Sequence, residues 1–197
     1  MIRKQQEYIL KDLNKKMVFI TGPRQVGKTW LAKKISENYN KTLYLNFDNY
    51  EDRKIIKNQS WFPEVELIIL DEIHKMPDWK TYIKGIYDTK SKKQKIIVTG
   101  SSGLDYLKQS GDSLAGRYFR HRLLPFSISE IKNEISNSID KLIHRGGFPE
   151  PFLSDNEEDA LRWRMQYIDG LIKYDILDFE KIHDFKAMHN VLETLRH

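Results

Sequence analysis

The chain has 197 residues, enough for one α/β domain with a sizeable core and part of a second unit. It contains no cysteine, which excludes disulfide bonds and thiolate metal sites. No apolar stretch approaches the roughly 20 residues that a bilayer-spanning helix needs, and no signal peptide is recognisable, so we expect a soluble, cytoplasmic protein that does not bind membranes. The net charge of +5 is uneven, because residues 1–41 carry ten Lys and Arg against three Asp and Glu.

Short apolar runs alternate with helical patterns along most of the chain. After an amphipathic amino-terminal helix, we expect strands at 17–20, 42–47, 66–70, 95–99 and 118–124, with helices between them. Such alternation predicts an α/β fold in which a parallel five-stranded sheet is flanked by helices. Ligands of these sheets bind at the carboxyl ends of the strands.

The segment between the first strand and its helix matches a phosphate-binding pattern. It reads G-P-R-Q-V-G-K-T, which fits G-x-x-x-x-G-K-[ST], the loop of P-loop NTPases. Glycines let the backbone N–H groups turn toward the phosphates, Lys28 adds a positive charge, and the Thr29 hydroxyl can bind Mg²⁺. We expect a nucleotide site built from Gly22, Pro23, Arg24, Gln25, Val26, Gly27, Lys28, Thr29 and the adjoining Trp30.

Two acidic residues end the third expected strand. Asp71 would hold Mg²⁺ together with Thr29, and Glu72 could orient or deprotonate the attacking water. Taken alone, this pair could instead be a strand end whose acid caps the next helix. The phosphate-binding loop upstream favours the functional interpretation.

Two further residues complete the expected site. Ser101, or alternatively Ser102, follows the fourth strand and can contact the γ-phosphate, unless this G-S-S-G segment is only a flexible turn. Arg117, near the start of the fifth strand, could reach a γ-phosphate in its own subunit or a neighbour's, or form a plain salt bridge.

The pattern changes toward the carboxyl terminus. The segment 145–150, R-G-G-F-P-E, is typical of a hinge, and helical patterns follow from about residue 156. We expect an ATPase core over 1–150 and a helical segment over 151–197, the start of a lid. Because two or three helices cannot bury their apolar faces alone, this segment either continues beyond this chain or packs back on the core.

Five segments together resemble a known family. GPRQVGKTW, LIILDEIHKMPDW, IIVTGSSGL, SLAGRYFRHRLLPFSISEI and RGGFPEPF, in this order, resemble the prokaryotic AAA-like ATPases, related to archaeal and STAND ATPases. In these proteins an ATPase module precedes a carboxyl-terminal domain of unknown function. The resemblance implies that Arg117 is an arginine finger or sensor and that Pro149 packs near the adenine. It also implies that a winged helix and a nuclease-like domain follow.

These observations predict Mg²⁺-dependent ATP binding and hydrolysis that drives or gates a conformational change, with ATP and Mg²⁺ as cofactors. Lys28, Glu72, Ser101 and Arg117 are the expected catalytic residues, and Arg117 acting in trans would imply a homo-oligomer. Two alternatives stay open: a low-turnover nucleotide-gated switch, and a nucleic-acid-dependent ATPase. The second is supported by the basic run at Lys90, Lys92, Lys93 and Lys95. The protein partner or effector domain is not predicted.

Overall fold

The computed structural model describes residues 3–100, 114–131 and 138–171. The chain divides into two compact units, Met1–Ile135 and Ser136–His197. This division falls earlier than the expected one after residue 150, because the segment before 150 packs with the helices that follow it. Within the described ranges, no helix is long and apolar enough to cross a membrane.

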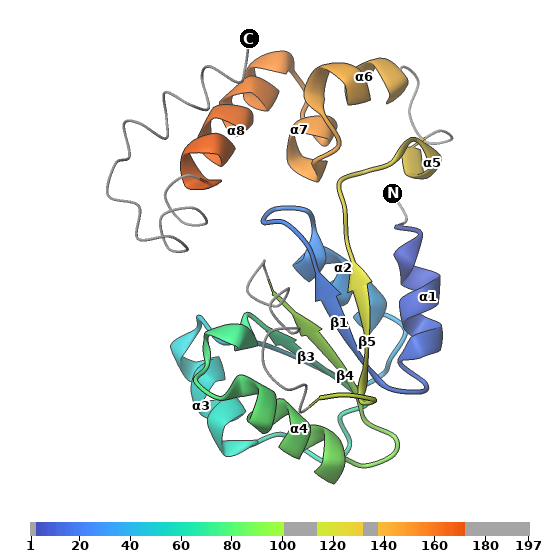
Figure 1. Ribbon diagram of the computed structural model, residues 1–197, viewed down its shortest axis with the longest axis vertical. Coiled ribbons are helices and arrows are strands. Elements are labelled where there is room, and N and C mark those ends of the chain that lie inside the picture. The colour runs from blue at the N-terminus through green and yellow to red at the C-terminus, as the bar shows by residue number, and fades with distance from the viewer. Residues whose placement is uncertain (1–2, 101–113, 132–137, 172–197) are drawn as a thin grey trace. The chain divides into compact units, whose positions relative to one another are not determined.

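The first unit alternates helices and strands as the sequence predicts (Figure 1). Its strands are β1 (Met17–Thr21), β2 (Thr42–Asn46), β3 (Leu67–Asp71), β4 (Lys95–Thr99) and β5 (Tyr118–Arg122). Its helices are α1 (Gln5–Asp12), α2 (Lys28–Ser36), α3 (Tyr50–Asn58), α4 (Trp79–Thr89) and α5 (Ile128–Ile131), with a 3₁₀ turn, η1, at Ile73–Lys75. The short helix expected at 104–109 lies outside the described residues.

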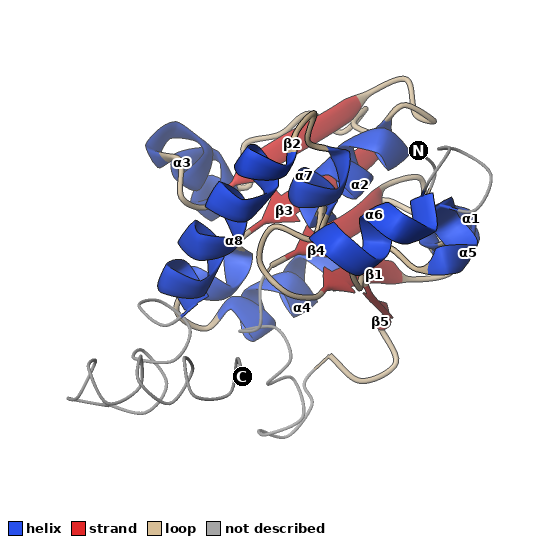
Figure 2. Ribbon diagram, turned by 90° about the horizontal axis from the view of Figure 1, so that it is seen from above, coloured by secondary structure: helices blue, strands red, loops and turns tan. Residues whose placement is uncertain are grey.

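The five strands form one parallel sheet in the order β2-β3-β4-β1-β5, which Figure 2 shows from above. The central strands β1 and β3 are buried along their whole length, as strands covered on both faces must be. The edge strands β2 and β5 are only partly buried. The expected fold class, a parallel five-stranded sheet flanked by helices, is confirmed.

Helices cover both faces of the sheet. Phe19 and Ile68 pack with α3 and α4, where Ile56, Ile83 and Ile86 are buried. The alternate strand residues face α1 and α2, which bury Ile9, Leu31 and Ile35. Figure 1 shows the two helix pairs on opposite sides of the sheet. The sheet thereby lies between two apolar layers, and the carboxyl ends of its parallel strands lie at the same end of the sheet.

The second unit contains three described helices, α6 (Ser138–Arg145), α7 (Pro149–Leu153) and α8 (Glu157–Gly170). The Phe148 ring lies 5.2 Å from Trp163 and 4.9 Å from Tyr167. Buried Arg145 donates from Nε to Glu157 at 2.6 Å and also bonds Ser154. The 145–150 segment expected to be a hinge therefore lies inside this unit, joined to α8 by rings and an ion pair. The helix expected from about residue 185 lies outside the described residues.

Candidate nucleotide-binding site

The loop between β1 and α2 has a backbone that two glycines make possible. Gly22 has φ +143°, and a Cβ placed there would lie 2.2 Å from the Leu123 carbonyl oxygen. Leu123 is held against the loop because its N–H donates to the Thr21 carbonyl at 2.8 Å. Gly27 has φ +94° and stands directly before α2. The sequence pattern thus needs glycine at position 22 because a side chain would clash there, and at position 27 because the backbone adopts a positive φ.

Lys28 opens α2 and is almost fully buried, with 8% of its surface exposed. Its Nζ donates to the carbonyl oxygens of Gly22 at 3.0 Å and Pro23 at 2.7 Å. The ammonium group therefore lies over the loop, beside the N-terminal end of the helix. The helix dipole and this charge both favour an anion at the same place.

Asp71 is the centre of a hydrogen-bond network that joins four elements. Its Oδ2 accepts from Thr29 Oγ1 and from the Tyr44 hydroxyl, each at 2.8 Å, and its Oδ1 accepts from Thr99 Oγ1. These partners come from α2, β2 and β4, and the parallel register places Thr99 directly beside Asp71. Only 4% of Asp71 is exposed, so the three hydroxyl donors fix the direction of a buried carboxylate.

The sequence did not point to Tyr44 and Thr99 as site residues. Burial, followed by the hydrogen bond to Asp71, raises the pKa of Tyr44, which keeps the phenol protonated and able to donate. Lys33 Nζ lies 4.3 Å from the centre of the Tyr44 ring. The position of Thr99 at the end of its strand, like that of Asp71, is a sequence signal that could have identified it. Tyr44 carries no such signal, because its hydrogen bond to Asp71 depends on the pairing of β2 with β3.

Glu72 follows Asp71 in a left-handed backbone conformation, with φ +55° and ψ +22°. Its N–H donates to the Thr99 carbonyl at 3.0 Å, so the turn is tied to β4. Glu72 Oε2 lies 3.5 Å from His74 Nε2 and 3.8 Å from Lys75 Nζ. Burial raises the pKa of Glu72, and Lys75 opposes that shift. A non-glycine residue in this region is uncommon, and in this chain Gln25, Gln59 and Asp78 share it.

His74 is uncharged beside Glu72 at neutral pH. Burial lowers the pKa of His74 to about 4, and its Nδ1 has no hydrogen-bond partner among the described residues. The 3.5 Å contact with Glu72 is therefore not an ion pair under these conditions. Lys75, which also bonds Asp48 at 2.5 Å, lies 3.8 Å from the Glu72 carboxylate and is the cation in ion-pair range of it among the described residues.

The donor atoms of this edge fit a magnesium ion bound together with phosphate. Thr29 Oγ1 and Asp71 Oδ2 are hard oxygen atoms of the kind Mg²⁺ prefers. The described parts of the chain hold no cluster of three or more His, Cys, Asp or Glu that would form an all-protein metal cage. Mg²⁺ usually takes one or two protein ligands and completes its shell with water and substrate phosphate, so the residues present suit it.

The buried Thr21 Oγ1, directly before Gly22, has no partner among the described residues.

The structure brings most of the expected site residues together. Gly22–Thr29, Asp71 and Glu72 meet at the carboxyl edge of the sheet. Trp30 is 50% exposed, so it does not pack in the core. Ser101 lies outside the described residues. Pro149 is the first residue of α7 in the second unit, and its contact with the adenine stays a prediction.

Arg117 lies at the end of the sheet where the strands begin, opposite the carboxyl edge that carries the phosphate-binding loop. It precedes β5, whose first residue Tyr118 pairs with Met17, the first residue of β1, whereas the phosphate-binding loop follows the last. Its Nε and Nη2 bond the two carboxylate oxygens of Asp88 at 2.8 and 3.1 Å. The expectation that Arg117 reaches a nucleotide bound by its own chain is therefore wrong, because a whole strand separates them. A role in a neighbouring subunit stays a prediction.

Residues 14–132 match the AAA domain family, and residues 136–197 match a domain of unknown function, DUF8612. The chain therefore belongs to the AAA domain family. This agrees with the resemblance to AAA-like ATPases that carry a carboxyl-terminal domain of unknown function.

Curated relatives are distant and themselves uncharacterized. An uncharacterized protein of Methanocaldococcus jannaschii is 25% identical, over 98% of this chain and 51% of its own length. One of Mycobacterium tuberculosis is 26% identical, over 81% of this chain and 36% of its own length. The chain thus spans about half, or less, of the length of these relatives.

Among solved structures, a Walker-type ATPase of Pyrococcus abyssi superposes with a TM-score of 0.58 at 15% identity. The match covers 91% of this chain and 75% of that one. At this identity the likeness establishes the fold alone, which is that of a P-loop NTPase and is compatible with nucleotide binding.

Proposed function

We propose that the chain binds ATP with Mg²⁺ and hydrolyses it at the carboxyl edge of the sheet. The observation that carries this proposal is the contact of Thr29 with Asp71 at 2.8 Å, with Glu72 on the adjacent turn. A bare phosphate-binding loop would suit a kinase equally well. The added carboxylate, held in a left-handed turn and raised in pKa by burial, favours a hydrolase.

Each residue has a defined task in this proposal. Backbone N–H groups of the loop face the phosphates, and Lys28 exchanges its bonds to the Gly22 and Pro23 carbonyls for phosphate oxygens. Thr29 and Asp71 hold Mg²⁺, which neutralises charge that develops on the β- and γ-phosphates. Tyr44 and Thr99 keep the Asp71 carboxylate oriented.

Glu72 acts on the water. The water oxygen forms a bond to the γ-phosphorus while the bond to the ADP oxygen breaks, and the water proton passes to the Glu72 carboxylate. A carboxylate with a raised pKa is a stronger base for this proton than an exposed one. Products are ADP and inorganic phosphate.

Counting the phosphate released per chain tests hydrolysis against the alternative of a nucleotide-gated switch. Many phosphates per chain support the enzyme, whereas ATP binding with no more than one phosphate released per chain would support the switch. Lys28→Ala should abolish release, because it removes the loop's buried cation. Lys34→Ala, in the same helix but paired with Glu37 on the surface, is the matched control. Equal activity of the two variants would contradict the proposed site.

A further inference from the structure

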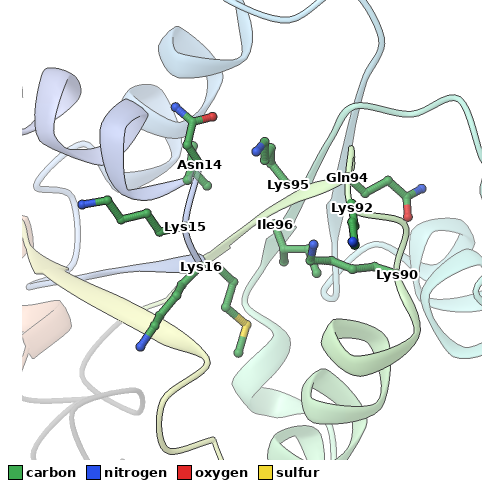
Figure 3. A pocket seen from close by; sticks show the side chains of 10 residues that line it. Asn14, Lys15, Lys16, Lys90, Lys92, Gln94, Lys95 and Ile96 are labelled. Carbon is green, nitrogen blue, oxygen red and sulfur yellow. The ribbon is translucent and has the colours of Figure 1, made fainter.

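The sheet brings two basic segments together at the edge opposite the phosphate-binding loop. Lys15 and Lys16 precede β1, and Lys90, Lys92 and Lys95 lie before or at the start of β4. Because β1 and β4 pair in parallel, with Val18 beside Ile97, the residues that lead into the two strands become neighbours. Together they line a hollow of about 300 Å³ (Figure 3).

The charges of these five lysines, called here the lysine edge, are not balanced by carboxylates. Among the described residues none of the five forms an ion pair with Asp or Glu. Three acids lie nearby: Asp12 is paired with His121 at 2.8 Å, Asp88 with Arg117 at 2.8 Å, and the Glu66 carboxylate accepts from the Asn40 N–H at 2.9 Å. Burial lowers the pKa of Lys90, and the neighbouring charge of Lys95 lowers it further. The edge therefore favours an anionic partner.

The arrangement suits a row of phosphates better than a single one. In Figure 3, Lys15 and Lys16 extend away from Lys90 and Lys92 instead of converging on one point. Three buried apolar residues, Leu13, Met17 and Ile96, also line the hollow. Lysine provides a point charge on a flexible stem, which contacts successive backbone phosphates without reading sequence.

The lining also lacks the groups that recognise bases. No aromatic ring or arginine lines the hollow among the described residues, so the hollow itself offers bases no stacking platform. The Phe119 and Tyr87 rings lie against Lys16 and Lys90, at 5.1 and 5.3 Å from each ammonium group, without lining the hollow. Its two amide side chains are engaged within the chain, because Asn14 bonds the Leu10 carbonyl and the Gln94 oxygen accepts from the Ser91 N–H. The hollow therefore suits recognition of the phosphate backbone of a nucleic acid and not of its bases.

We propose that the lysine edge binds the phosphodiester backbone of duplex nucleic acid without sequence preference. The site is separate from the nucleotide site, because the two lie at opposite ends of β1 and β4. Binding to this edge does not require that the chain hydrolyse ATP, so the two proposals fail independently.

The test measures binding of a fluorescent 20-base-pair DNA duplex to the whole chain at several salt concentrations. The double variant Lys15→Gln/Lys92→Gln removes one charge from each segment of the lysine edge. It should weaken binding on the order of tenfold at low salt and reduce the slope of log K against log salt by about two, near one per phosphate contact. Unchanged ATP affinity shows that the variant is folded.

The matched control is Lys54→Gln/Lys57→Gln, which removes the same charge from exposed positions on α3. It should bind the duplex as the unmodified chain does. Equal weakening by both double variants, or tighter binding of single-stranded than of duplex DNA, would overturn the proposal. So would displacement of the duplex by stoichiometric inorganic tripolyphosphate at constant ionic strength, which would assign the hollow to a small anion.

Discussion

Thr29 Oγ1 donates to Asp71 Oδ2 at 2.8 Å, although 42 positions separate the two residues in the sequence. The contact joins the first turn of α2 to the end of β3, and so connects the phosphate-binding loop to the carboxylate edge. Three hydroxyl donors converge on Asp71 in all. The geometry of the proposed magnesium site therefore depends on strand pairing as much as on the loop itself.

Tyr44→Phe tests whether the network around Asp71 stabilises the fold. The change removes one hydrogen bond to a buried carboxylate and leaves the ring in place, so we expect a loss of about 1 to 2 kcal/mol in the free energy of unfolding. Tyr50→Phe is the matched control, because Tyr50 is 66% exposed. Urea unfolding of both variants measures the effect, and equal stabilities would mean that the Tyr44 bond contributes nothing.

Gly22→Ala tests the steric reason for the first loop glycine. The added Cβ would meet the Leu123 carbonyl at 2.2 Å in a left-handed backbone, so we expect a loss of more than about 1 kcal/mol in unfolding free energy, together with loss of ATP binding.

Gly85→Ala is the contrasting substitution. Gly85 lies inside α4 with nothing within 4 Å of a new Cβ, so alanine should stabilise the chain by about 0.5 to 1 kcal/mol. The two glycine variants should therefore shift the urea midpoint in opposite directions. A neutral Gly22→Ala variant would show that the loop does not need its close approach to Leu123.

His74 should make stability depend on pH. Its pKa is lowered to about 4 in the folded chain, against about 6.5 when unfolded, so between these values only the unfolded chain binds the proton. Stability is therefore lost as pH falls from about 6.5 toward 4. After allowance for partial solvent contact, we expect a contribution of about 1 to 2 kcal/mol between pH 7 and pH 5.

The measurement is the unfolding free energy of the unmodified chain and of His74→Gln at both pH values. The variant should lose that much less stability on acidification, whatever its stability at pH 7. The same pH dependence in both proteins would contradict a buried, neutral His74.

Arg117→Ala should leave ATP affinity unchanged, because Arg117 pairs with Asp88 at the far edge of the sheet. If Arg117 acts on a nucleotide bound by a neighbouring subunit, the turnover of the Arg117→Ala variant should fall. Mixing this variant with Glu72→Gln protein should then restore activity. Asp88→Asn is the control, because it breaks the same ion pair and keeps the arginine. Full turnover by Arg117→Ala alone would exclude the role in trans.

The strands and the phosphate-binding loop could be predicted from sequence because their signals are local. An apolar run, two glycines, Lys28 and Thr29 occupy one continuous stretch, and Asp71 closes another. The observed β1, β3 and β4 agree with the expected strands to within a residue.

The remainder of the site depends on which strands are neighbours. Tyr44 reaches Asp71 because β2 pairs with β3, and Thr99 because β4 lies on the other side of β3. No local pattern contains that order. The motif around Arg117 does not contain the direction of its strand. Because β5 runs parallel to β1, a residue before β5 lies at the end of the sheet away from the phosphate-binding loop. The local sequence contains only the Lys90–Lys95 part of the lysine edge, since Lys15 and Lys16 join it through the β1–β4 pairing.

The most direct test of the account is phosphate release by Glu72→Gln, measured beside its ATP affinity. Glu64→Gln, an exposed position before β3, is the control and should behave as the unmodified chain does. We predict that Glu72→Gln binds ATP with Mg²⁺ normally and that its multiple-turnover rate falls on the order of 10² to 10⁴-fold, the usual contribution of a general base. Normal phosphate release by Glu72→Gln would contradict the assignment of Glu72 and, with it, the proposed hydrolytic site.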